Sequence, residues 1–214
     1  MTHLVLDVPF VTQLGFGDPA NPRDDPTGCW YASACMVGYF FEAGPRLGAP
    51  QFFKAGLGRT ADGRRTGGHK ALQLGDYPIL MANEELVAVP QPAGDSWTAA
   101  GLAELLRRYG PLMFIWTKRL NGQEYGHASV VIGVIDAGTP KVVVHDPENA
   151  PLSLIALSDF NAAFWFGPPE AMLRRDGPEY QRTFNPGAAI PAPKPKMPMA
   201  VHTPPLPRGG AGRP

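Results

Sequence analysis

The stretch PTGCWYASAC, residues Pro26–Cys35, leads from a loop-forming segment into a helical one and contains both cysteines of the chain. Residues 15–28 are rich in Gly, Pro, Asp and Asn, a composition that favours a loop. Over residues 29–43 apolar side chains recur at helical spacing, and a Gly-Pro pair follows directly. We therefore predict a helix over 29–43, with the Thr27 hydroxyl as its N-cap and Cys29 in its first turn.

Cys29 stands where a cysteine can act as a nucleophile. In the first turn of a helix the backbone N–H groups lack intrahelical acceptors, and together with the helix dipole they favour a negative charge. This environment favours the thiolate, which is the nucleophilic form of cysteine. A buried core position is the alternative interpretation, because cysteine is among the most buried residue types. Cys35 fits that alternative well.

The two cysteines are not expected to form a disulfide. Six helical residues separate their Cα atoms by about 9 Å along the helix axis, whereas a disulfide joins Cα atoms less than about 7 Å apart. Two free thiols are typical of a reducing environment. No metal-ligating residues stand at the close spacing of a zinc site, so neither a metal nor another cofactor is expected.

A histidine and an aspartate stand at the ends of two consecutive predicted strands. The apolar runs 127–135 and 141–145 have the spacing of an antiparallel hairpin, which places His127 beside Asp146 at one edge of the sheet. An imidazole oriented by a carboxylate is what a thiol nucleophile needs from its base. Taken singly, the two residues could be a strand-end histidine and a turn former. The nearest rival, His145, points to the opposite face from Asp146 in an extended chain.

The remaining histidines are weaker candidates. His69 lies in residues 56–69, a Gly- and Arg-rich segment that we interpret as a surface loop. That loop either borders a substrate cleft, where its arginines would favour acidic groups, or is a plain solvated connection. His3 and His202 lie near the ends of the chain.

The remaining pattern predicts helices in the first half of the chain and an antiparallel sheet in the second. A second helix is predicted over 98–109, where leucines line one side and a Gly-Pro pair follows. Extended segments are predicted at 8–12, 112–117, 152–157 and 163–166. This order of elements favours an α+β fold in which a helical part packs against the sheet.

Composition limits the domain organisation and the classes of partner. The 214 residues suit one domain, predicted over 1–184, followed by a tail over 185–214 that we expect to be disordered because nine of its residues are proline. Lys and Arg balance Asp and Glu at 19 each, which argues against nucleic-acid binding. No apolar run is long enough to span a membrane, and the first residues do not read as a secretory signal.

Four short motifs, taken in order, resemble the papain-like cysteine peptidases. They are Gln13, Gly28-Cys29-Trp30 opening a helix, Gly126-His127-Ala128 opening a strand, and Asp146-Pro147 closing the next strand. The compact size and the strand sequence are most similar to the small bacterial branch, which includes effector-type papain-like proteases and bacteriocin leader peptidases. The resemblance covers about residues 5–167.

The resemblance implies a papain-like fold and a role for each matching residue. Cys29 would be the nucleophile, His127 the general base, and Asp146 the residue that orients the imidazole. Gln13 would donate its side-chain amide to the oxyanion hole, together with the Cys29 backbone N–H. Papain has asparagine in the third position, so Asn149 is the alternative to Asp146 there.

We therefore expect a cysteine endopeptidase that acts on a protein or peptide through a covalent acyl-enzyme. A delivered bacterial effector or toxin is one setting, with an immunity protein, an inhibitor or a delivery machinery as further partners. The expected location is the cytoplasm, or a target cell reached by signal-peptide-independent secretion. Two alternatives stay open: a peptidoglycan amidase, acyltransferase or deamidase on the same fold, and a non-catalytic binding module.

Overall fold

A computed structural model describes residues 3–13, 28–41 and 72–176, all of which belong to one compact unit. The N-cap predicted at Thr27, the Gly- and Arg-rich segment 56–69 and the Pro-rich tail 185–214 lie outside the described residues. The division of the chain at residue 184 therefore stays a prediction.

Helix α1 (Cys29–Phe41) begins at the cysteine of the opening stretch, as predicted. Its first hydrogen bond runs from Ala32 N to Gly28 O at 3.0 Å, so Cys29 occupies the first turn. Trp30 and every residue from Ala32 to Gly38 are buried. A helix with apolar residues on most of its sides belongs in the interior, and α1 packs against the sheet.

The strands form one antiparallel sheet in the order β2-β7-β3-β4-β5-β6, with β1 paired to β4 off this path. Their bounds are β1 His3–Val5, β2 Leu86–Ala88, β3 Leu112–Leu120, β4 Gln123–Ile135, β5 Lys141–His145, β6 Ser153–Ala156 and β7 Met172–Arg175. The other helices are α2 (Tyr77–Glu84), α3 (Ala99–Tyr109) and α4 (Leu157–Ala163), with short 3₁₀ turns at Leu74–Asp76 and Pro169–Ala171. The α+β class predicted from the order of elements is confirmed.

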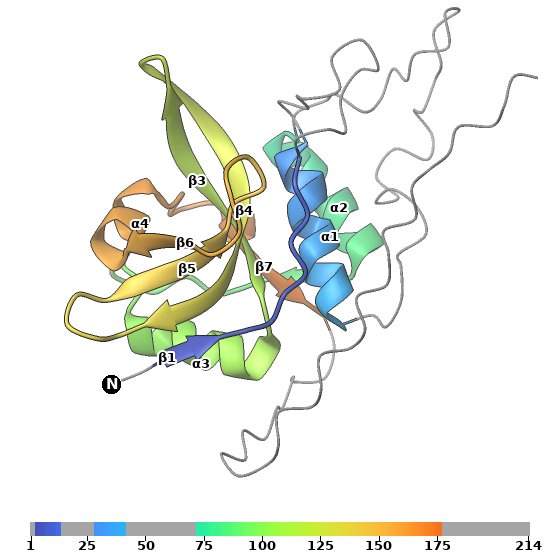
Figure 1. Ribbon diagram of the computed structural model, residues 1–214. Helices are drawn as coiled ribbons and strands as arrows, with labels where there is room; N and C mark the ends of the chain where they lie inside the picture. The colour runs from blue at the N-terminus through green and yellow to red at the C-terminus, as the bar shows by residue number, and fades with distance from the viewer. Residues whose placement is uncertain (1–2, 14–27, 42–71, 177–214) are drawn as a thin grey trace, which may run out of the picture. The chain divides into compact units, whose positions relative to one another are not determined.

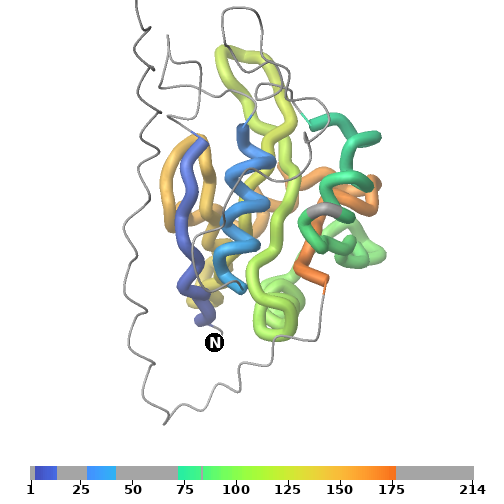
Figure 2. Tube along the Cα trace, turned by 90° about the vertical axis from the view of Figure 1, so that its right-hand side faces the viewer, coloured from blue at the N-terminus to red at the C-terminus, as the bar shows by residue number. Residues whose placement is uncertain are grey.

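Helices cover the sheet on both sides (Figure 1). Helices α1 and α2 lie on one side, and α4 lies on the other. Seen from the side of α1, the N-terminal segment runs alongside this helix across the sheet (Figure 2). On the α4 side an aromatic cluster fills the core, with Phe114 from the sheet 5.0 Å from Phe160 and 6.4 Å from Phe164 between ring centroids.

Strands β3 and β4 form a long hairpin that projects beyond the rest of the sheet (Figure 1). Its turn is the pair Asn121-Gly122, at φ 51° and 80°. Two positive φ values at the centre of a two-residue loop are typical of a type I′ turn, which matches the right-handed twist of the strands. The strands predicted at 112–117 and 127–135 are therefore parts of longer ones that meet at this turn.

Strand β4 contains one extra residue, Ile132, in its pairing with β5. Val131 pairs with Val144, whereas the next pair is Gly133 with Val143, which is the pattern of a β-bulge. The other edge of β4 also changes partner here, because β3 pairs as far as Val131 and β1 begins at Gly133.

Other predicted elements have mixed outcomes. The helix over 98–109 is confirmed as α3, with the Thr98 hydroxyl as N-cap accepting from Gly101 N at 3.0 Å. The segment 152–157 contains β6, but at 163–166 only an isolated bridge from Phe164 to Trp116 forms, because α4 extends to Ala163. Residues 8–12 have no regular structure, and α2, α4, β1, β2 and β7 were not predicted. No helix in the described part of the chain is long and apolar enough to cross a membrane.

Replacing Gly133 by alanine should loosen the hold of β1 on β4. A Cβ at this position would lie 2.5 Å from Leu4 O, a backbone atom that can move only if β1 moves. We expect Gly133→Ala to lower the free energy of urea unfolding by about 1–3 kcal/mol. Gly94→Ala is the matched control, because a Cβ there meets nothing within 4 Å. Equal stability of the two variants would contradict this packing.

Candidate active site

His127 and Asp146 lie side by side, as the sequence predicted, and both are buried. His127 lies on β4 and Asp146 directly follows β5, and Nε2 of the histidine is 2.7 Å from Oδ1 of the aspartate. Both residues are almost fully buried, at 2% and 1% exposure. An ionised carboxylate can only accept hydrogen bonds, so Nε2 carries a hydrogen and donates it to Asp146. In the neutral ring the other nitrogen, Nδ1, is then unprotonated and can act as a base.

The strand register places Asp146 on the same face of the sheet as His127. Val130 of β4 pairs directly with His145 of β5, and residues directly opposite each other share a face. His127 is three residues from Val130 and so lies on the other face. Asp146, one residue beyond His145, also lies on that other face.

The bulge at Ile132 is what selects the aspartate. If the pairing near the β4–β5 turn continued without an extra residue, Val131 would pair with His145. His145 would then share a face with His127, and Asp146 would be turned away from it. A one-residue insertion in β4 therefore decides which side chain reaches the imidazole.

Cys29 interacts with the His127 side chain and helps to raise the pKa of the imidazole. Since Nε2 is taken by Asp146, the ring nitrogen that remains available to a thiol is Nδ1. Cys29 is partly exposed, whereas His127 is buried. The first turn of α1 contains no acidic residue that would oppose a thiolate there.

The charges of this group stabilise one another. Burial lowers the pKa of His127, but the hydrogen bonds with Asp146 and Cys29 and their charges outweigh it and raise this pKa to about 9. Burial raises the pKa of Asp146, but its bonds with His127 and Lys118 lower it to about 2. The imidazolium therefore contributes stability that is fully present below pH 6.5 and is lost as the pH rises through 9.

Asp146 is the centre of a hydrogen-bond network. Oδ1 accepts from His127 Nε2 and, at 3.1 Å, from the backbone N of Glu148. Oδ2 accepts from Asn149 Nδ2 and from Lys118 Nζ, both at 3.1 Å. With both oxygens engaged, the carboxylate cannot rotate away from the imidazole without breaking several bonds. Asn149, the alternative third residue, donates to the Asp146 carboxylate, and the imidazole is bonded to Asp146.

Aromatic rings flank the imidazole on the hairpin. Trp116, directly opposite His127 across the β3–β4 ladder, and Tyr125 have ring centroids 6.3 and 6.1 Å from that of His127. Trp116 is itself fixed, because its Nε1 donates to Ser129 Oγ at 3.1 Å. These rings restrict the His127 side chain to its bonded orientation.

Three residues of the network were not predicted from the sequence: Lys118, Glu148 and Tyr125. Lys118 Nζ forms an ion pair with Glu148 as well as with Asp146, and Tyr125 OH donates to Glu148 Oε2 at 2.6 Å. The signal was the Asn-Gly pair at 121–122, because a two-residue turn there pairs Lys118 with Tyr125 and carries both back toward His127.

One group of described residues has the donor set of a metal site. Ligand atoms of His127, Asp146 and Glu148 all lie within 4.8 Å of one another. The ammonium group of Lys118 already binds both carboxylates, so the cluster has a cation of its own. We therefore interpret it as an ion-pair network and assign no metal to it.

Gln13 lies beside the loop that follows β5. Its backbone N donates to Pro147 O at 3.0 Å, and the Thr12 hydroxyl donates to the same oxygen at 3.1 Å. Gln13 is buried, at 3% exposure. The chain thus brings Gln13 next to the residue that follows Asp146, and its predicted oxyanion role stays a prediction.

His145 joins two segments that flank the site. Its Nε2 is 2.9 Å from Val8 O, and its Nδ1 accepts from Leu152 N at 3.1 Å. This pattern requires the neutral ring, and burial lowers the pKa of His145, against the opposing effects of the Val8 bond and Asp7. His145 therefore ties the segment leading to Gln13 to the loop that contains Asp146.

The other sequence candidates lie elsewhere. His3 is an exposed residue of β1, and Cys35 is a buried residue of α1. His69 and His202 fall outside the described residues. Both cysteines are free thiols, as expected.

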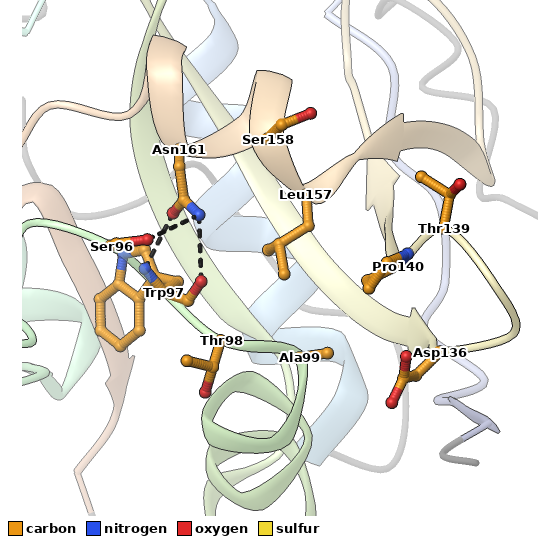
Figure 3. Close-up of a pocket in the computed structure, with 10 residues that line it drawn as sticks. All are labelled: Ser96, Trp97, Thr98, Ala99, Asp136, Thr139, Pro140, Leu157, Ser158 and Asn161. Carbon is orange, nitrogen blue, oxygen red and sulfur yellow. Dashed lines mark hydrogen bonds between the residues drawn. The ribbon is translucent and has the colours of Figure 1, made fainter.

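A cavity of about 420 Å³ between the start of α3, the start of α4 and the β4–β5 turn lies apart from this group (Figure 3). None of Cys29, His127 and Asp146 lines it. Its most conspicuous polar side chain, Asn161, is bonded to the backbone N and O of Trp97 and to Ser96 Oγ, which secures α4 to the start of α3. We therefore place the candidate site at Cys29 and not in this cavity.

Changing His145 should separate a structural role from a titrating one. Glutamine can donate to Val8 O and accept from Leu152 N, whereas leucine can do neither, so we expect His145→Leu to cost about 2 kcal/mol or more of unfolding free energy. Because the folded-state pKa of His145 is lowered, wild-type stability should fall as the pH drops below 6.5. In His145→Gln this fall should be smaller. Identical urea-unfolding profiles from pH 7.5 to 5 in the wild type and His145→Gln would contradict a structural role for the neutral His145 ring.

Comparison with known proteins agrees with this geometry. The family model described as papain-like cysteine protease AvrRpt2 matches residues 3–164. The fold is similar to the crystal structure of a protein from Bacillus anthracis described as C39-like peptidase, with a TM-score of 0.51 and 17% sequence identity. That similarity covers 84% of this chain and all of the other. The chain therefore belongs to the papain-like cysteine proteases and is a cysteine peptidase of papain-like fold.

Proposed function

We propose that the protein is a cysteine endopeptidase in which Cys29, His127 and Asp146 form the catalytic triad. The observation that supports this is the buried His127 ring, which is hydrogen-bonded to the Asp146 carboxylate and interacts with Cys29. Three separate elements, α1, β4 and the loop after β5, contribute one member each. A nucleophile, a base and an orienting group in this order are the requirement for acyl transfer by a thiol.

The first half of the reaction acylates the enzyme. His127 Nδ1 takes the thiol proton, and the Cys29 thiolate attacks the carbonyl carbon of the scissile amide. As the tetrahedral intermediate collapses, the imidazolium donates that proton to the leaving nitrogen, and the C–N bond breaks. Asp146 keeps Nε2–H in place throughout, so Nδ1 always faces the reacting atoms.

The second half regenerates the enzyme. Neutral His127 takes a proton from water, the hydroxide attacks the thioester carbon, and the C–S bond breaks as the proton returns to sulfur. In both halves a negative oxygen forms next to Cys29. We propose that the Cys29 backbone N–H and the Gln13 side-chain amide stabilise it, as the resemblance implies.

A bacterial effector or toxin is the setting we propose for this activity, with a protein of the target cell as substrate. This proposal rests on the resemblance to effector-type papain-like proteases and on the Pro-rich composition of residues 185–214. Proteomic analysis of new N-termini in cells that express the wild type or Cys29→Ala tests it. Substrates cleaved only by the wild type are expected, and the absence of any would contradict the setting.

Cys29→Ala should abolish peptide hydrolysis, while Cys35→Ala should keep most of it. The first substitution removes the nucleophile, and we expect a loss of kcat/KM on the order of 10³-fold or more on a peptide library. Cys35 is buried in the same helix six residues away, so its variant controls for damage to α1. A Cys29→Ala protein that still hydrolyses peptides would exclude the proposed triad, and cleavage of cell-wall fragments alone would favour the amidase alternative.

Gln13→Ala should lower kcat far more than it raises KM. An oxyanion-hole donor acts only in the transition state, and losing one typically costs about 2.7–4 kcal/mol, or roughly 10²–10³-fold in kcat. Asn149→Ala is the comparison variant, because its amide binds the carboxylate and not the substrate. An unchanged kcat in Gln13→Ala would remove Gln13 from the oxyanion hole.

A further inference from the structure

The hydrogen-bonded chain of the site continues beyond Asp146 as a series of alternating charges. Lys118 Nζ lies 3.1 Å from Asp146 Oδ2 and also contacts Glu148 Oε2, which in turn accepts from Tyr125 OH at 2.6 Å. The order His127, Asp146, Lys118, Glu148 therefore alternates imidazolium, carboxylate, ammonium and carboxylate. No step of the proposed reaction uses Lys118, Glu148 or Tyr125.

Lys118 is held in an unusual place for a lysine. Its side chain is only 14% exposed, and lysine is rarely buried unless it is paired. Ordering and desolvating a long charged side chain is costly, and a buried ion pair is weak evidence for stability. Its neighbour on β3, Arg119, is a typical surface cation, because that side chain is 75% exposed and pairs with Glu124 across the hairpin.

We propose that Lys118 is a positioning residue that binds Oδ2 of Asp146. Together with the opposite charge of Glu148, it sets how strongly His127 retains its proton. The inference rests on the proposed function, in which His127 must both accept and release that proton. Because Lys118 binds Oδ2 of Asp146, the Oδ1 atom of the same carboxylate is held in one orientation toward His127. The β3–β4 hairpin positions Lys118 for this contact, since Lys118 and Tyr125 are directly paired across the two strands.

The effect on His127 follows from the charges that surround it. Cys29 from α1 and both Asp146 and Glu148 from the loop after β5 interact with the imidazole. The Tyr125 ring on β4 lies beside it, and Lys118 from β3 contacts the two carboxylates. Tyr77, from α2, faces Cys29. Among these groups, the ammonium of Lys118 is the single fixed cation within the described residues.

Removing Lys118 leaves two carboxylates near the imidazolium without their counter-ion, so the ring should retain its proton more strongly. Removing the charge of Glu148 leaves the ammonium less compensated and should weaken that retention. A base that binds its proton too strongly donates it poorly to the leaving amine, because efficiency is greatest when proton affinity matches the working pH. Lys118 thereby keeps His127 usable as an acid as well as a base.

The test is a titration of the His127 ring by NMR in the full chain, with Cys29→Ala in every protein so that the thiol does not titrate as well. We expect Lys118→Met to raise the His127 pKa by about one pH unit and Glu148→Gln to lower it by a similar amount. The double variant should return close to the parent. Arg119→Met is the matched control, with the same charge change one residue along β3, and should leave the His127 titration in place.

Opposite shifts that cancel in the double variant cannot come from a scaffold role, which would instead alter stability or broaden the signal. Equal His127 titration in Lys118→Met and Arg119→Met, or shifts in the same direction for Lys118→Met and Glu148→Gln, would overturn the proposal. If Lys118→Met does not fold, Lys118→Gln and Glu148→Gln decide the same question. The readout needs no substrate, so an inactive wild type would contradict the proposed function and leave this result to be judged separately.

With Cys29 present, the pH dependence of kcat/KM is the second readout. Its alkaline limb should move to higher pH in Lys118→Met and to lower pH in Glu148→Gln, because that limb follows deprotonation of the imidazolium. A uniform drop in rate with no movement of the limb would count against tuning of His127.

Discussion

The one-residue bulge at Ile132 is the constraint on which the site depends, because it fixes the face to which Asp146 points. On one side of Ile132, β4 is paired with β3 and carries His127, and on the other side it is paired with β1. The extra residue also changes the register against β5. A single inserted residue thus decides which of two neighbouring side chains at a strand end points to a given face. Here it places the carboxylate of Asp146, and not the imidazole of His145, on the face of His127.

His145, which the bulge turns to the other face, has a distinct task there. It remains neutral and joins the N-terminal segment to the loop after β5 through two hydrogen bonds. The two histidines therefore have opposite electrostatic settings, although they lie close together. The pKa of His127 is raised by a carboxylate and a thiol, and that of His145 is lowered mainly by burial. This contrast separates the histidine that we propose as the catalytic base from a neutral, structural one.

Much of the site could be predicted from the sequence because each member stands at a recognisable boundary. Cys29 follows a loop and begins a helix, His127 is close to the start of an apolar run, and Asp146 ends the next one. The bulge could not be predicted, since Ile132 is one of several similar apolar residues in β4. Lys118 and Tyr125 were missed because the predicted strands covered only 112–117 and 127–135, although the Asn-Gly pair determines how these two residues meet. Short elements such as β2 and β7 acquire their structure from pairing within the sheet, which local sequence does not encode.

The proposed triad implies that Cys29 and His127 form a thiolate–imidazolium pair in the folded protein. The most direct test is the rate of iodoacetamide alkylation of each cysteine as a function of pH, read by mass spectrometry in the wild type and in His127→Ala. We expect rapid alkylation of Cys29 at pH 6, slower by about tenfold or more in His127→Ala, while the buried Cys35 reacts slowly in both. A Cys29 that reacts at pH 6 at the same rate with and without His127 would contradict it.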